Sequence, residues 1–143
     1  VDIVVINDGE ATMLAETDNL IQAAKDVQAM ADIPTLIIKK GEHGVIALHG
    51  DELIALPAYP TDAVVDPTGC GDTFAGTIAA CLAAGNGPVE TDELRDALLH
   101  ATVSASFTLE DFGTKGLQSM TDEIYRHRLL NYCSMTGTSI KSS

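Results

Sequence analysis

The residues best suited to chemistry lie in one short loop, residues 66–72, with the sequence DPTGCGD. Because a helix is expected to follow this loop, the backbone N–H groups of Gly69, Cys70 and Gly71 would point outward at its positive end. The two glycines also allow an anion to approach the main chain without an intervening side chain. The loop therefore predicts a binding site for an anion such as a phosphate group.

Spacing excludes two other nucleotide-binding loops. A dinucleotide fingerprint starting at Gly69 would need glycine at position 74, where the chain has Phe74. A Walker loop needs Gly-Lys followed by Ser or Thr, and this triplet does not occur in the 143 residues. The anion site is thus of a different kind.

Asp72 adds a carboxylate to the same loop. A carboxylate beside a bound anion repels it, so its presence suggests a role at a reacting oxygen. Transfer of a phosphoryl group to an alcohol needs neutralisation of charge on the phosphoryl oxygens and a group that accepts the hydroxyl proton. The backbone of the loop supplies the first and Asp72 the second. The competing interpretation is that Asp72 caps the helix, and residue types alone leave both open.

Residues 66–76, DPTGCGDTFAG, closely resemble the C-terminal signature of the ribokinase-like (PfkB) carbohydrate kinases, D-T-x-G-A-G-D-x-F. Pro67 stands where Thr is usual, and Cys70 stands where Ala is usual. Cys70 is small enough to keep the backbone geometry, and we interpret it as a passive substitute rather than a thiol that senses oxidation.

The resemblance implies an ATP-dependent phosphotransferase that transfers the γ-phosphoryl group to a hydroxyl of a sugar or sugar-like small molecule. It implies that Asp72 is the general base and that the backbone of Gly69, Cys70 and Gly71 is the anion hole. Within enzymes, a nucleoside kinase is the nearest alternative. From a different class, a non-catalytic nucleotide- or anion-binding module, a degenerate or split kinase half, stays open.

Residues 7–10, Asn-Asp-Gly-Glu, are similar to the N-x-x-E motif of the same family. The resemblance implies that Asn7 and Glu10 help to place Mg²⁺, through bound water. Amide and carboxylate oxygens suit such an outer-shell role because Mg²⁺ retains several waters. The competing interpretation is a turn followed by a capped helix.

Further positions resemble the nucleotide and cation sites of the family. Residues 39–44 are similar to the turn that follows the nucleotide phosphates, which implicates Lys39, Gly41 and Gly44. The resemblance also implies nucleotide contacts for Thr68 and His100, with His100 at the adenine pocket. Asp66, with the carbonyl of Thr68, matches positions that hold a monovalent cation in some members. The implied cofactors are ATP, Mg²⁺ and, in that subset, K⁺.

The elements that would position these residues follow from hydrophobic periodicity and turn residues. Gly50-Asp51 predicts a tight hairpin turn, and Asp18 is a candidate cap for the first long helix. Strands are expected at 1–6, 35–39, 45–49, 53–56 and 64–65, and helices at 19–31, 73–84, from Thr91 or Asp92 to about 109, and 121–131.

This order predicts a layered α/β domain with parallel strands and one antiparallel hairpin. The resemblance makes it a three-layer ribokinase-like (Rossmann-like) sheet flanked by helices, without the N-terminal half and the β lid. We expect residues 1–131 to form the nucleotide-binding and catalytic part and residues 132–143 to form a mobile tail. The absence of a Gly-Gly pair and the start at Val1 suggest part of a longer protein, inactive alone.

The composition of the chain limits the kinds of molecule that it is expected to bind. The chain has 21 acidic and 8 basic residues, for a net charge of −13, which disfavours nucleic acid and anionic membrane surfaces as partners. No apolar run approaches the roughly 18 residues that span a bilayer. Three cysteines without paired short spacing predict reduced thiols. We therefore expect a cytoplasmic protein that binds a small-molecule substrate, with self-association through any apolar face left uncovered.

Overall fold

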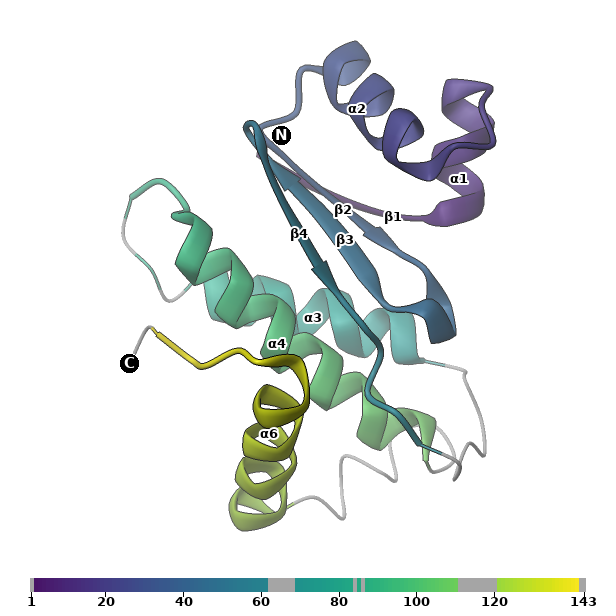
Figure 1. The fold of residues 1–143 in the computed structure, drawn as a ribbon. Helices are drawn as coiled ribbons and strands as arrows, with labels where there is room; N and C mark the ends of the chain where they lie inside the picture. Colours follow the sequence, from purple (N-terminus) through teal and green to yellow (C-terminus); the bar gives the residue numbers. More distant parts are fainter. Residues whose placement is uncertain (1, 62–68, 84, 86, 111–120, 142–143) are drawn as a thin grey trace. The chain divides into compact units, whose positions relative to one another are not determined.

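The computed structural model describes residues 2–61, 69–83, 85, 87–110 and 121–141 (Figure 1). These residues divide into two compact units, an N-terminal unit that ends at Ala58 and a C-terminal unit that begins at Tyr59. The N-terminal unit is a sheet with two helices. The C-terminal unit is helical in its described part.

Among the described residues, four strands form a sheet in the order β1-β2-β3-β4, with bounds β1 Ile3–Asn7, β2 Thr35–Lys39, β3 Val45–His49 and β4 Glu52–Leu56. Strands β1 and β2 are parallel, and Asn7 is the register partner of Lys39 at their carboxyl ends. The predicted hairpin is confirmed, because β3 and β4 pair antiparallel around Gly50-Asp51 with His49 opposite Glu52.

The pairing of β2 with β3 differs from the predicted pattern, since these two strands are also antiparallel. Their connection is short and contains the 3₁₀ turn η1, Gly41–His43. Lys40 N donates to Gly44 O at 2.7 Å, which closes the turn. A parallel crossover needs a dozen or more residues, so this connection only permits an antiparallel return. The hairpin therefore joins the parallel pair as one mixed sheet.

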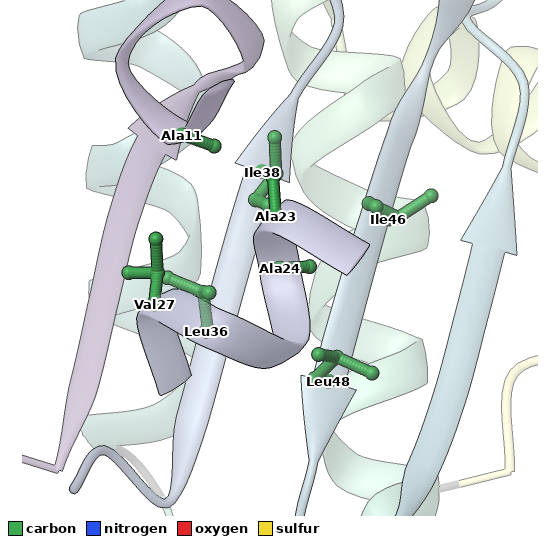
Figure 2. Close-up of a cluster of buried hydrophobic side chains, with 8 residues drawn as sticks. All are labelled: Ala11, Ala23, Ala24, Val27, Leu36, Ile38, Ile46 and Leu48. Atoms are coloured by element: carbon green, nitrogen blue, oxygen red, sulfur yellow. The ribbon is translucent and has the colours of Figure 1, made fainter. Parts of the chain in front are cut away.

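Helices α1, Asp8–Ala15, and α2, Leu20–Ala31, connect β1 to β2. Figure 2 shows the core that they form on one face of the sheet, with α2 residues Ala23, Ala24 and Val27 above strand side chains. Positions 36 and 38 of β2 and 46 and 48 of β3 share that face because side chains alternate along a strand. The alanines let α2 approach closely, and this packing fixes the carboxyl edge of β1 and β2.

The described part of the C-terminal unit contains three helices, α3, Cys70–Ala83, α4, Thr91–Leu109, and α6, Asp122–Thr136. Helix α4 packs against both α3 and α6. It is therefore buried on more than one side, and Leu94, Leu98, Leu99 and Val103 have no exposed surface. Within the described ranges, no helix is long and apolar enough to cross a membrane.

Several helix ends differ from the sequence-based expectations. Asn19, not Asp18, caps α2, because its Oδ1 accepts a hydrogen bond from Gln22 N at 2.9 Å. Helix α4 begins at Thr91 after Glu90, which makes no side-chain cap bond.

The last helix runs past the predicted end at Asn131 to Thr136. Tyr132 and Cys133 are buried, so packing favours the extra turn, and Gly137 then ends the helix in a left-handed conformation. The predicted short strand at 64–65 lies outside the described residues.

Candidate functional site

Gly69 opens helix α3 with a backbone φ of +85°, a conformation that favours glycine. Its carbonyl accepts the first intrahelical bond, from Thr73 N at 2.9 Å. Cys70, Gly71 and Asp72 are therefore the first three helical residues. The N–H groups of a first turn have no acceptor within the helix, and they form the positive end of its dipole. This geometry fits an anion of the size of a phosphate group.

Asp72 is exposed to solvent at the third position of α3. The capping position belongs to Gly69, so Asp72 does not occupy the place that N-cap residues take. As an acidic residue in the first turn, it adds a favourable charge at the positive end of the dipole. The carboxylate follows the loop amides on the same first turn, and its role as a base stays a prediction.

The first turn of α3 is supported by the last turns of α4. Thr73 Oγ1 lies 3.0 Å from Thr108 Oγ1, and Cys70 Sγ donates to the carbonyl oxygen of Ala105 at 3.7 Å. A Cβ atom on Gly69 would lie 3.7 Å from the Thr108 methyl group. Sequence reasoning missed Thr73 and Thr108, because a contact between residues 35 positions apart has no local sequence signal.

Asn7 and Glu10 lie where β1 meets α1 in the N-terminal unit. Asn7 Oδ1 accepts from Glu10 N at 2.7 Å, while Asn7 Nδ2 donates to Glu10 Oε1 at 2.6 Å. The interpretation as a capped helix is thus confirmed, and both side chains are exposed. Two oxygen-bearing side chains held together at a strand end fit outer-shell binding of Mg²⁺, which stays a prediction.

The structure brings Lys39 to the same edge of the sheet as Asn7, since the two are register partners at the ends of β1 and β2. Gly41 and Gly44 follow in the closed turn after β2, and both have positive φ. Ligands of open α/β sheets bind at the carboxyl ends of strands. The placement of Lys39, Gly41 and Gly44 fits a phosphate-lining turn.

His100 is half buried at the contact between α4 and α6. Its Nδ1 lies 2.6 Å from the hydroxyl of Tyr125, and the two rings stack at 5.8 Å with an angle of 5°. Burial lowers the pKa of His100, while the charge of Asp96 opposes this shift. Burial also raises the pKa of Tyr125. Tyr125 was not anticipated from the sequence, and the contact of His100 with adenine stays a prediction.

The remaining predicted positions divide between the two units or lie outside the structure. Asp66 and Thr68 fall outside the described residues. Among the described residues, no group of three or more His, Cys, Asp or Glu side chains could hold a metal ion. Lys39 and its neighbours belong to the N-terminal unit, whereas the α3 turn and His100 belong to the C-terminal unit.

The sequence of the chain matches one family model and a set of curated proteins. The model of the pfkB family of carbohydrate kinases matches residues 1–120. The Bifunctional protein HldE of Pseudomonas aeruginosa (strain UCBPP-PA14) is 33% identical over 106 residues, which cover 73% of this chain and 21% of that protein. The chain thus spans about a fifth of the length of the curated relatives that it matches.

Solved structures show the same fold. The aminoimidazole riboside kinase of Salmonella enterica, complexed with aminoimidazole riboside and an ATP analog, matches with a TM-score of 0.75 and 23% identity over 90% of this chain and 42% of that chain. The fructokinase of Vibrio cholerae O395, with fructose, ADP and calcium bound, matches with a TM-score of 0.79 and 18% identity. The match covers 90% of this chain and 41% of the fructokinase chain. The predicted ribokinase-like α/β fold is confirmed, and the chain belongs to the pfkB family of carbohydrate kinases.

Proposed function

We propose that this chain is the nucleotide-binding and catalytic part of an ATP-dependent kinase that phosphorylates a hydroxyl group of a sugar or sugar-like small molecule. The observation that carries the proposal is the first turn of α3, where Gly69 opens the helix at positive φ and Asp72 is exposed two residues after Cys70. Membership of the pfkB family supports this reading of the turn.

In the proposed reaction, the loop residues act on charge and Asp72 acts on a proton. The acceptor hydroxyl gives its proton to the Asp72 carboxylate as its oxygen attacks the γ-phosphorus of ATP, and ADP leaves. The first-turn amides stabilise negative charge on the phosphoryl oxygens, and they need no reorganisation because the helix already orients them. Both groups lie on one turn, which keeps base and anion hole at fixed separation.

The family resemblance also assigns a role to cations in the proposed reaction. Mg²⁺ would neutralise charge on the phosphates, and Asn7 and Glu10 would hold it through water. Lys39 adds a fixed positive charge at the same sheet edge. A K⁺ ion near Asp66 is proposed on family grounds alone. In one similar fructokinase structure, the bound ions and ligands are fructose, ADP and potassium.

The decisive experiment replaces Asp72 by Asn in the full-length kinase. Loss of the base should reduce kcat by about 10²- to 10⁴-fold, while nucleotide binding measured by calorimetry is retained. Asp51→Asn is the matched control, because it removes the same charge from the exposed hairpin turn and should leave turnover unchanged. Turnover by Asp72→Asn within about threefold of the parent would refute the assignment of the base.

Turnover with fructose and with a riboside would separate the two acceptor classes that similar structures bind. A sugar kinase should phosphorylate the first class and a nucleoside kinase the second. The alternative of a non-catalytic module predicts nucleotide binding without turnover of either, both before and after the change at Asp72.

A further inference from the structure

The last turns of α4 contact the proposed anion hole on one side. We call residues 105–110, which end α4 and include its C-cap Glu110, the α4 end segment. Ala105 accepts the bond from the Cys70 thiol, and Thr108 bonds Thr73. Any shift of this segment would therefore move the turn that carries Asp72.

One side chain of α6 contacts three other residues of the α4 end segment. Arg128 Nη1 donates to Ser106 Oγ at 3.0 Å, and Nη2 donates to Glu110 Oε1 at 2.8 Å. The guanidinium carbon lies 3.9 Å from the centre of the Phe107 ring. Arg128 thus contacts three residues of the same short segment that supplies the two residues supporting α3.

The contacts of Arg128 are sheltered from solvent. Its side chain is 19% exposed and that of Glu110 is 21% exposed, so water screens the pair less than a surface ion pair. Tyr59 lies over the same guanidinium at 4.9 Å and accepts a hydrogen bond from Asn131 at 3.2 Å. A planar fork that bonds two oxygens and stacks on rings is specific to arginine. Lysine cannot reproduce this set of contacts.

We propose that Arg128 is a positioning residue for phosphoryl transfer, because it fixes the α4 end segment on which the Gly69–Asp72 turn rests. The inference rests on the proposed function of that turn. Arg128 does not need to touch either substrate. It acts through Ser106 and Glu110, and displacement of a reacting group by about 1 Å can cost as much as 100-fold in rate.

The test is Arg128→Met in the full-length kinase, assayed at a temperature at which the variant is fully folded. Methionine keeps an apolar side chain against Phe107 but removes both donors. We expect kcat to fall about tenfold or more, with the KM of the acceptor substrate within about twofold. The kcat of Arg128→Lys should lie between those of the parent and Arg128→Met, because lysine keeps the charge opposite Glu110 but loses the two-pronged guanidinium.

Tyr132→Phe separates positioning from loss of stability. Tyr132 is fully buried on the same helix, and its hydroxyl bonds the side chain of Thr102 on α4, outside the α4 end segment. This variant should lower the melting temperature while leaving kcat unchanged. Equal losses of kcat in Tyr132→Phe and Arg128→Met would overturn the proposal.

A double-mutant cycle with Glu110→Gln tests the route through the α4 end segment. If Arg128 acts through Glu110, the kcat of the double variant should match that of Arg128→Met within about twofold, rather than showing multiplied losses. A double variant whose loss of kcat is the product of the two single losses would refute the positioning role. So would an unchanged kcat in Arg128→Met while Asp72→Asn is inactive. Both outcomes would leave the proposed function of Asp72 standing. Full activity of Asp72→Asn would instead refute the proposed function.

Discussion

Gly44 gives the sharpest structural prediction, because its backbone lies directly against the end of β4. Its φ is +95° and its ψ is −144°, a region that only glycine adopts readily. A Cβ atom placed there would lie 2.1 Å from Leu56 O and 2.8 Å from Pro57 Cα. Both neighbours are backbone atoms, so no side chain can rotate away to relieve the overlap.

The expected cost of Gly44→Ala is the sum of two effects. The unfavourable backbone conformation costs about 1–3 kcal/mol, and a forced backbone overlap costs a further amount of about 1–3 kcal/mol. The change should therefore lower the free energy of unfolding by about 2–6 kcal/mol, a large share of the roughly 5–15 kcal/mol that holds a typical domain folded.

Gly41→Ala is the matched control in the same turn. Gly41 has φ of +58°, and no heavy atom lies within 4 Å of a Cβ placed on it. Only the left-handed conformation is penalised there, by about 1–2 kcal/mol. Urea unfolding followed by far-ultraviolet circular dichroism measures both variants. A Gly44→Ala cost no greater than that of Gly41→Ala would refute the argument from backbone overlap.

Two further predictions concern pH. Burial lowers the pKa of His100, so the unfolded chain binds more protons there, and the free energy of unfolding should fall as pH drops below about 6.5. His100→Gln should weaken this pH dependence, measured by urea titrations at about pH 5.5 and 7.5. An equal pH dependence in the variant and the parent would contradict the prediction. Burial raises the pKa of Tyr132 to about 12, so absorbance at about 295 nm should show its phenol ionising near that pH. Its contribution to the free energy of unfolding should disappear between about pH 10 and 12. Ionisation near pH 10 in the folded protein would contradict this.

Local patterns predicted much of the fold. The alternation around Gly50-Asp51 predicted the β3–β4 hairpin, because a two-residue turn and period-2 burial are local properties. The apolar spacing from Leu94 onward predicted α4 up to Leu109. The antiparallel pairing of β2 with β3 was missed, because turn geometry at Lys40–Gly44, rather than strand composition, determines that direction.

Helix ends were predicted less well for a related reason. Asp18 and Asn19 are both good cap residues, and only the path of the chain into α2 places Asn19 Oδ1 on the Gln22 amide. The extension of α6 to Thr136 depends on burial of Tyr132, which a polar local sequence does not reveal.

The sequence by itself determined the content of the candidate site. Gly69, Cys70, Gly71 and Asp72 follow one another, so a helix start is enough to place loop amides and a carboxylate on one turn. The sequence alone also showed that the surrounding residues resemble the kinase signature, and the family match confirms this resemblance.

Only the tertiary structure decided what supports that turn. Thr108 and Ala105 reach α3 from 35 residues along the chain, and Arg128 reaches the α4 end segment from another helix. Such contacts depend on how α3, α4 and α6 pack, and helical periodicity specifies which face is buried but not which partner covers it. Local sequence therefore specified the chemical groups of the site, whereas helix packing specified the residues that hold them in place.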